Sequence, residues 1–469
     1  MRIRQGRQEG SVLIVVVVVM ALAGITLGSY LQLVANQNLS VTRSMAWNSA
    51  ISVAEGGIEE AMAHVNHNGT NRAVDGWTDT GIIIHTPMVG TNLTIPANYV
   101  SRERVVGDNK YVVYVTRDMD PPIIYAEGYV AHPQTGDYLP RPRIIRATTE
   151  SDFLFTKGMV AKGQIDLSGN NIKTDSFDSS SDEYSTDGKY DSSKAKDGGD
   201  VATNSAVIDS LNVWNADIYG KVSTGPGGSV KIGKNGSVGS KAWHDAGNSG
   251  IEEGYFSDDM NVQFPEVQAP FSGGGWSPDT SVVVDGTNYT YVVGTGNYQM
   301  NSLSMSGGGN MLVNGDAVLY ITGNVSLSGQ SYIYIESGAS LQMYVAGTST
   351  SIGGSGVMNG DAKASSFGYW GLPSNTSVSM HGNAAFTGTI YAPQAALTLG
   401  GGGNNNYDFV GSTITKTVKM NGHFQFHYDE ALKSFGPRRG YTIASWNEAS
   451  WEEIHGVANI PELPGGELL

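Results

Sequence analysis

The feature that most constrains this chain is a strongly apolar stretch near the N-terminus, which runs from Ser11 to Thr42 without an acidic or basic side chain. It contains five consecutive valines, Val15–Val19, and about 20 such residues in a helix cross the hydrocarbon core of a bilayer. Three arginines precede it, and the positive-inside bias keeps that end in the cytoplasm. The stretch therefore predicts a membrane anchor with the rest of the chain on the other side.

A helical pattern continues beyond the anchor. Apolar residues recur at spacings of three and four, which marks one face of a helix: Ile51, Ala54, Ile58, Ala61, Met62 and Val65. Asn68-Gly69 then supplies a left-handed stop. The sequence thus predicts one helix of roughly 80 Å, apolar in its first half and amphipathic in its second. A cleavable secretory signal would have a shorter apolar run, and a plain signal anchor is the competing interpretation.

These N-terminal residues resemble the type IV pilin and pseudopilin superfamily. The basic leader Met1–Gly10, the Gly10/Ser11 junction and the uncharged Ser11–Leu33 segment match its pattern, and Ala54–Met62 looks most like PilX-type pilus-assembly proteins. The resemblance implies that a prepilin peptidase cuts after Gly10 and methylates Ser11. It also implies a transmembrane half that packs in a filament core, with the residues Val12, Leu13, Ile14, Val15, Val16, Met20, Leu22 and Leu27.

The chain departs from the family pattern at the fifth mature position. Most pilins carry a glutamate there, which is understood to pair with the amine of a neighbouring subunit during filament growth. This chain has Val15 instead. The change resembles minor, initiating or tip subunits and argues against the role of a major pilin.

Residues 70–150 change from a helical to an alternating period. Tyr111–Val115, Ile123–Ala126 and Ile144–Ala147 predict short strands separated by proline-containing turns. A long helix followed by an antiparallel sheet is the α+β outline of a pilin-like head. The sheet is needed because the amphipathic stripe of the helix must be buried against another layer.

Residues 151–437 are rich in glycine, serine and asparagine, and the chain has 62 glycines in 469 residues. Short apolar alternations such as Val318–Ile321 and Leu341–Val345 recur between glycine-containing turns. Closely spaced short strands without helices predict a mostly-β domain, as a parallel β-helix rather than a β-sandwich. The last segment, 438–469, carries Trp446 and Trp451 and is expected to dock on this coil before an exposed tail.

Three stretches of this region, 156–170, 386–393 and 426–432, resemble an uncharacterised bacterial domain that is often found behind PilX-type N-termini. No biochemical activity follows from that resemblance. The combination of the two resemblances favours a large pilin-like protein.

Composition excludes several classes of function. Lys+Arg number 28 and Asp+Glu 44, for a net charge of −16, and nucleic-acid binding needs the opposite sign. The chain has no cysteine, which removes disulfides, thiolate zinc sites and cysteine nucleophiles. We expect no cofactor.

Two nucleotide- or metal-like patterns fail on spacing. Gly228–Asn235 approaches a P-loop, but Asn235 stands where Ser or Thr must bind magnesium, and no helical sequence follows. His423 and His427 are four apart, as in a helical zinc site. Their segment alternates as a strand, which separates them by roughly 13 Å, too far for one metal ion.

The segment from Asp175 to Asp200 is acidic, and clustered carboxylates suit calcium. The weak calcium candidates are Asp175, Asp178, Asp182 and Asp187. No EF-hand or nonapeptide spacing is present, so a solvated, mobile loop is the preferred interpretation over a metal site.

Catalysis has little support in the sequence. Lyases similar to pectate lyases need an arginine base, and there is no arginine from Leu154 to Pro437. Asp316 and Asp361 could still pair as acid and base for glycoside hydrolysis. Four aromatic residues could stack on sugars or belong to the core: Tyr332, Tyr334, Tyr369 and Trp370. We expect no enzyme, with an exported polysaccharide lyase or hydrolase as a remote alternative.

The sequence as a whole predicts a structural protein held in the bacterial inner membrane, with most of its chain periplasmic or extracellular. Its expected partners are the membrane, prepilin peptidase and other pilin-like subunits in a type IV pilus or a type II secretion-like filament. A cap or tip position fits best. The main alternative is a bitopic surface protein whose β-helix binds a glycan or another cell.

Overall fold

The computed structural model describes residues 9–87, 94–132, 135–139, 141–169, 171–381, 385–400, 407–421, 424–435 and 438–450. The chain divides into two compact units. The first, called the head below, comprises Met1–Asp152 and Arg439–Leu469; the second, called the inserted unit, comprises Phe153–Arg438. Both ends of the chain therefore belong to the head, and the inserted unit interrupts it in sequence.

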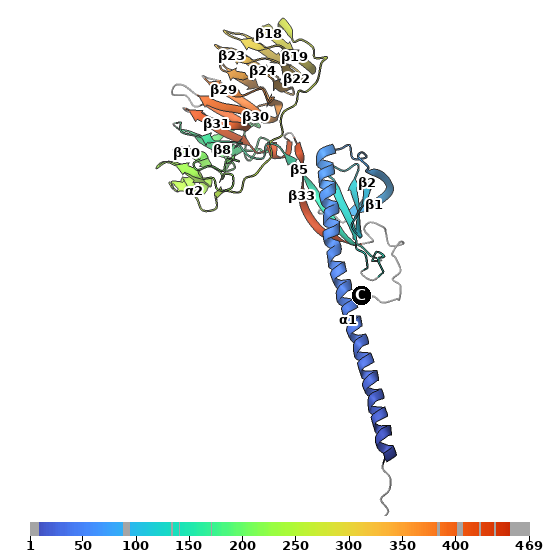
Figure 1. The fold of residues 1–469 in the computed structure, drawn as a ribbon. Coiled ribbons are helices and arrows are strands. Elements are labelled where there is room, and N and C mark those ends of the chain that lie inside the picture. The colour runs from blue at the N-terminus through green and yellow to red at the C-terminus, as the bar shows by residue number, and fades with distance from the viewer. Residues whose placement is uncertain are drawn as a thin grey trace, which may run out of the picture. The chain divides into compact units, whose positions relative to one another are not determined.

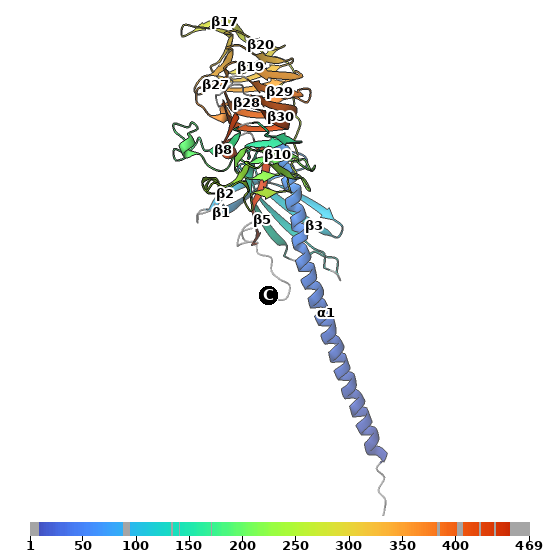
Figure 2. The same ribbon diagram turned by 90° about the vertical axis from the view of Figure 1, so that its left-hand side faces the viewer.

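A single helix, α1 (Glu9–Asn68), runs through the N-terminal region (Figures 1 and 2). It ends where Gly69 adopts a φ of +58° and donates its N–H to the Val65 carbonyl oxygen at 2.9 Å. Glycine takes this left-handed conformation without the steric cost that a Cβ would add. The predicted long helix and its stop are confirmed.

Six strands form the sheet of the head, in the order β1-β2-β3-β4-β5-β33. The first five make an antiparallel meander: β1 (Thr78–Pro87), β2 (Thr94–Val106), β3 (Asn109–Thr116), β4 (Ile123–Tyr129) and β5 (Arg143–Phe153). The three strands predicted between residues 111 and 147 lie in β3, β4 and β5. The expected antiparallel sheet is therefore present.

The second half of α1 packs directly on β3 and β4. Two glycines allow the close approach: a Cβ at Gly128 would lie 2.0 Å from the Ala50 carbonyl oxygen, and one at Gly57 would lie 3.1 Å from the Tyr111 ring. The predicted helical face is buried here, in a core of Ala54, Ile58, Ala61, Val65, Trp77, Val100, Tyr111, Val113, Val115, Ile124, Ala126, Ile145, Ala147 and Tyr441.

The segment after the inserted unit returns to the head. β33 (Arg438–Ala449) adds to the sheet beside β5, and the prediction that 438–469 docks on the coil is wrong for this strand. The Asn66 side chain accepts from the Tyr441 backbone N–H at 2.7 Å and donates to its carbonyl at 3.2 Å. Buried Arg72 donates to the Tyr441 hydroxyl at 3.3 Å. Apolar burial of Tyr441 against α1 and these bonds hold the strand in the head. Trp451 lies outside the described residues.

The inserted unit is a large, mostly parallel arrangement of short strands in three stacks, in which most strands pair with one three strands further along the chain. The first stack is β18 (Thr287–Val293), β21 (Asn310–Val313), β24 (Tyr332–Ile335), β27 (Gly356–Asn359), the starts of β30 (Ala385–Gly400) and β31 (Tyr407–Asn421), β32 (Phe424–Asp429), β8 (Lys173–Phe177), β11 (Asp217–Tyr219), β14 (Ser237–Gly239) and β15 (Gly250–Ile251).

The other two stacks are built in the same way. The second is β19 (Gly296–Met300), β22 (Asp316–Ile321), β25 (Ser340–Val345), β28 (Phe367–Gly371), the middles of β30 and β31, β6 (Met159–Ala161), β9 (Val201–Thr203), β12 (Val222–Ser223) and β16 (Phe256–Ser257). The third is β20 (Leu303–Met305), β23 (Val325–Leu327), β26 (Ser349–Ile352), β29 (Ser377–His381), the ends of β30 and β31, β7 (Ile165–Asp166), β10 (Leu211–Trp214) and β13 (Val230–Ile232).

The order of strands in the stacks does not follow the order of the chain. The first strands of the inserted unit, β6, β7 and β8, lie in the middle of the three stacks, because β31 pairs with β6 and β7, and β32 pairs with β8. We call this contact the joint. Residues 258–278 then connect β16 to β17 (Asp279–Val284), an antiparallel strand beside β18 at the other end of the stacks. Four short helices lie between strands of the described part of this unit: η1 (Ser192–Lys194), α2 (Lys241–Asp245), η2 (Ala364–Ser366) and α3 (Leu432–Phe435).

The core of the inserted unit lies between the three stacks. Alternate residues of each strand point inward, as Ala317, Leu319 and Ile321 of β22 do. Equivalent positions of successive turns stack on each other: the rings of Phe386 and Phe409 lie 4.6 Å apart, and so do those of Phe409 and Phe426. The period-2 patterns in the sequence therefore identified both the strands and their buried faces.

Candidate functional site

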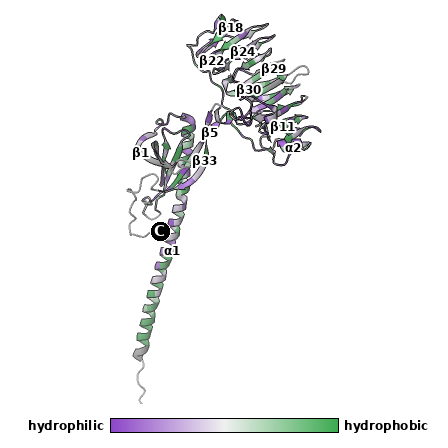
Figure 3. Cartoon of the chain, turned by 180° about the vertical axis from the view of Figure 1, so that it is seen from behind, coloured by the Kyte–Doolittle hydropathy of each residue, from purple (hydrophilic) through white to green (hydrophobic). Residues whose placement is uncertain are grey.

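The first candidate site is the N-terminal half of α1, which is exposed along its length. The apolar residues predicted for a filament core are between 45% and 70% exposed: Val12, Leu13, Ile14, Val15, Val16, Met20, Leu22 and Leu27. Figure 3 shows this half of the helix as mainly hydrophobic. It is long and apolar enough to cross a membrane, which suggests membrane anchoring.

The predicted processing site lies at the start of this helix. Gly10 and Ser11 have helical backbone, and nothing is described of their side chains. Residues 1–8 of the leader lie outside the described part of the chain. Val15, the fifth residue after the predicted cut, is 58% exposed and presents an apolar surface rather than a carboxylate.

The second candidate site is the acidic segment, whose carboxylates do not converge. Asp178 accepts from Ser180, and Asp191 caps η1 through Ser193, while Asp182 and Asp187 are exposed. Within the described residues no three acidic or histidine side chains are placed to hold one metal ion. The expectation of a solvated loop is wrong for Asp175, which is buried in β8.

Asp175 forms a buried pair with His427 of β32, 252 residues away in sequence. Its Oδ1 lies 2.5 Å from His427 Nδ1, and its Oδ2 accepts from the Tyr190 hydroxyl and from Lys173 Nζ, both at 2.8 Å. Tyr190 also stacks on the His427 ring at 3.6 Å. Burial raises the pKa of the Asp175 carboxyl, but His427 and Lys173 outweigh it and hold that pKa below its usual value.

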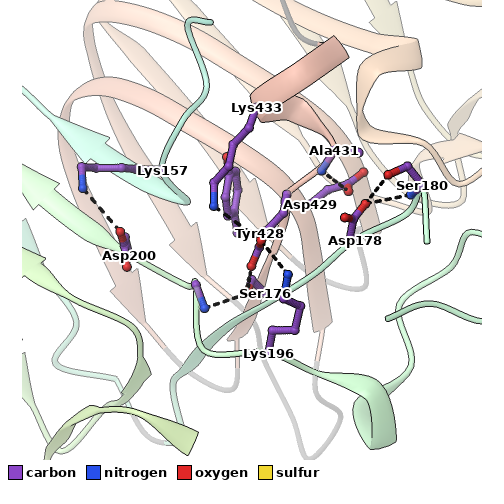
Figure 4. Close-up of polar contacts among 12 residues, drawn as sticks. Lys157, Ser176, Asp178, Ser180, Lys196, Asp200, Tyr428, Asp429, Ala431 and Lys433 are labelled. Atoms are coloured by element: carbon purple, nitrogen blue, oxygen red, sulfur yellow. Dashed lines mark hydrogen bonds and ion pairs between the residues drawn. The ribbon is translucent and has the colours of Figure 1, made fainter. Parts of the chain in front are cut away.

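A polar cluster next to this pair fastens the acidic segment to the end of β32 (Figure 4). Glu430 accepts from Ser176 at 2.7 Å and from Lys196 at 2.8 Å. Burial alone would raise the pKa of Glu430, but these two donors hold it below its usual value. Asp429 accepts from the Ser179 backbone and hydroxyl, yet burial still raises the pKa of its carboxyl.

The cluster lies where the chain enters and leaves the inserted unit. The Tyr428 hydroxyl donates to the Phe155 carbonyl at 2.7 Å, and the Ser412 hydroxyl donates to the Lys157 carbonyl at 2.6 Å. The carboxylates of Asp175, Asp429 and Glu430 each already accept hydrogen bonds from neighbouring side chains or backbone. These hydrogen bonds connect the first and last segments of the inserted unit and are suited to stabilising its fold. The sequence offered no local signal for the cluster, because its members come from both ends of the unit.

The remaining sequence candidates are dispersed. Residues 228–235 contain β13 and a turn that leads into β14, which is not the strand-to-helix setting of a P-loop. His423 lies outside the described residues, and His427 is on a strand as expected. The Asp316 and Asp361 carboxylates accept from Ser340 and Ser337, so each joins neighbouring turns of the stacks.

The aromatic candidates for sugar stacking are largely covered. Tyr369 is 1% exposed, and Tyr332 and Tyr334 are half-buried. Trp370 stacks on Tyr344 at 5.8 Å in an outward-facing row on the second stack. The connection 258–278 packs on this row through Met260, Val262, Phe264, Val267 and Phe271. The outward-facing row, which includes Tyr344 and Trp370, is therefore covered by this connection.

Comparisons with known proteins give limited further information. Residues 290–435 match a family described as a domain of unknown function, DUF7305. No curated protein matches the chain. Among solved structures, the competence-associated pilin ComZ from Thermus thermophilus is similar at 12% sequence identity with a TM-score of 0.26, over 86% of this chain and 97% of that chain. The domain match includes two of the three stretches that resemble an uncharacterised domain, and it adds no activity.

Proposed function

We propose that this chain is a membrane-anchored, minor pilin-like or pseudopilin-like structural subunit of a bacterium. The observation that carries the proposal is the two-part helix α1. Its first half is apolar and exposed, and its second half is buried in an antiparallel sheet. The same exposed side chains can contact lipid in an isolated subunit and neighbouring helices in a filament.

The proposed route begins with processing. Prepilin peptidase cuts between Gly10 and Ser11 at the cytoplasmic face of the inner membrane and methylates Ser11. The uncharged helix then moves laterally from the bilayer into a type IV pilus or a type II secretion-like filament. Because no acidic or basic side chain lies between Ser11 and Thr42, the helix carries no charged side chain into the filament.

The proposed position is a cap or tip. Val15 supplies no carboxylate to pair with the N-terminal amine of a neighbouring subunit, which disfavours a repeated shaft position. The inserted unit, more than half of the chain, would be displayed outward from the filament. We propose that this unit is a parallel β-helix, which its three parallel stacks and continuous interior support.

The alternative is a bitopic surface protein that binds a glycan or another cell through the inserted unit. The aromatic candidates give this alternative no added support, since Trp370 belongs to the row on which residues 258–278 pack and Tyr369 is buried in the core. An exported polysaccharide-acting enzyme is the remoter alternative, because Asp316 and Asp361 are each used as turn acceptors. We propose no catalytic role.

The mature N-terminus tests the proposal. We expect protein from native membranes to begin at N-methylated Ser11, as read by intact mass and N-terminal peptide analysis. Gly10→Leu should abolish this product, since the resemblance places the cut directly after a glycine, and Gly10→Ala is the matched small-residue control. A Gly10→Leu chain that matures normally, or a parent chain that keeps Met1, contradicts the pilin-like role and favours a simple anchor.

A further inference from the structure

The part of α1 between the membrane and the head carries a second apolar line. If the hydrocarbon core begins near Val12, about 20 residues bring its far boundary to Leu31. Tyr30, 62% exposed, fits the aromatic belt at such a boundary. The first residue buried in the head is Ala46, so residues 32–45, called the neck, cross neither the hydrocarbon core nor the head.

One line of residues on the neck, together with Leu31 at the membrane boundary, follows an alternating spacing of three and four. This line, called the neck stripe, consists of the apolar residues Leu31, Val34, Val41 and Met45 and the polar residue Asn38. Such spacing is that of the seam of a two-stranded coiled coil. Within the bilayer every face of α1 is apolar, so only the neck portion of the pattern is informative.

The neck stripe faces away from the head. Leu39 lies seven residues before buried Ala46, on the head side of the helix. On the stripe, Val41 and Met45 are 54% and 68% exposed, and Val34 is half-buried. The positions that continue the stripe along the head are polar, namely Asn48, Ser52, Glu55 and Glu59, and all of these except half-buried Glu55 are exposed. The stripe is therefore apolar only along the length of helix that the head leaves uncovered.

The membrane restricts what can cover this stripe. Every copy of the chain enters the bilayer with the same end first and at the same depth, so two copies meet in parallel and in register. Asn38 then lies opposite Asn38, where one amide donates to the other, as polar residues at such seam positions do when they fix register. No charged side chain lies between Ser11 and Thr42 to repel the second copy.

We infer that two copies of this chain pair through their neck stripes as a parallel, in-register helix dimer in the membrane. The inference rests on the membrane-anchored part of the proposed function. It defines a partner for α1 before any filament forms, in which two heads are held side by side. In this arrangement each stripe residue meets its own counterpart in the other copy.

Single cysteines test the pairing in the full chain, because the parent chain has none. Val34→Cys and Val41→Cys place thiols on the stripe, and Asn36→Cys and Ser40→Cys are matched controls on the opposite side of the neck. After oxidation of native membranes, we expect roughly fivefold more disulfide-linked dimer for the stripe positions than for the controls, since only seam residues meet their counterparts. Equal cross-linking on both sides, or none at either stripe position, overturns the inference.

A second pair of variants tests the seam asparagine. In the Val41→Cys background, Asn38→Asp sets two carboxylates against each other, and we expect the linked dimer to fall roughly fivefold. Asn36→Asp adds the same charge on the far side and should leave the dimer unchanged. Equal loss from both variants would mean that charge on the neck, rather than the seam, controls the cross-link, and would overturn the pairing.

The outcome for the dimer is separate from the outcome for processing. Cross-linking is read on protein in the membrane, whether or not residues 1–10 have been removed. If the chain keeps Met1 but the Val34→Cys and Val41→Cys variants cross-link, the result supports the dimer and contradicts the pilin-like role. If the chain begins at Ser11 but cross-links equally at stripe and control positions, the result supports the pilin-like role and contradicts the dimer.

Discussion

At the scale of single residues, the aspartates of the acidic segment differ in burial and therefore in their role. Asp175, Asp182 and Asp187 look alike in sequence, yet only Asp175 is buried, because β32 brings His427 beside it. The local sequence predicts a solvated loop, and that holds for the two exposed residues. A buried ion pair costs desolvation and needs several partners, which here come from Lys173 and Tyr190.

We expect Asp175→Asn to lower the stability of the inserted unit by about 3–5 kcal/mol at pH 7, because it removes the buried carboxylate that pairs with Lys173 and bonds to Tyr190 and His427. The pKa of Asp175 lies below its ordinary value of 3.8 in the folded chain. Its stabilising effect is therefore complete above the unfolded-state pKa and is lost as the pH falls through the folded-state pKa. Urea unfolding between pH 3 and pH 7 should show a smaller acid-induced loss for the variant than for the parent.

Asp187→Asn is the control for this substitution. Asp187 is exposed at a φ of +54°, a conformation that asparagine tolerates, so we expect a change within about 0.5 kcal/mol. If Asp175→Asn is equally mild, or if it leaves the pH dependence of the parent intact, the buried pair does not act as described.

At the scale of elements, periodicity predicts a helix or a strand and also its buried face. The apolar line from Ile51 to Val65 became the core-facing side of α1, and the alternation at 318–321 became β22. What periodicity omits is how closely two elements approach. Gly128 has no distinctive sequence context, yet α1 crosses β4 at this residue with no room for a side chain.

Gly128→Ala should loosen the contact between α1 and β4. The added Cβ would lie 2.0 Å from the Ala50 carbonyl oxygen, so the helix backbone must move, at a cost of about 3 kcal/mol. Hydrogen exchange of the full chain, read by mass spectrometry, should increase in peptides from residues 50–65. Gly308→Ala is the control, because nothing lies within 4 Å of its Cβ position. Unchanged exchange at residues 50–65 would argue against close packing at Gly128.

At the scale of the whole molecule, the chain order and the spatial order differ. The head is completed only by β33, after the inserted unit has been made, and the inserted unit closes only when β31 and β32 reach β6, β7 and β8. Ser412 and Lys157, bonded at the joint, are 255 residues apart. The connection 258–278 is the covalent link that this arrangement requires between the two ends of the stacks.

A cut in that connection should leave the inserted unit assembled. A specific protease site inserted between Gly273 and Gly274 lies in a glycine-rich part of the connection, where nothing is within 4 Å of either Cβ position. We expect the two fragments to elute together from gel filtration in native buffer and to separate only in denaturant, because the joint and the head sheet hold them. Hydrogen exchange at β6 and β31 should match that of the uncut chain, and rapid exchange there would contradict the joint.

The sequence by itself determined the apolar segment suited to a membrane anchor, the length and stop of α1, and the strands with a clear period-2 pattern together with their buried faces. These features depend on neighbouring residues, whose side chains repeat every 3.6 positions in a helix and every two in a strand. Only the tertiary structure decided which strands pair, that β33 returns to the head, and that His427 meets Asp175. Many strands of similar length and composition could pair with one another, and the entropy of closing a loop depends only weakly on its length. The choice among them is made by packing of the complete core, which no short segment contains.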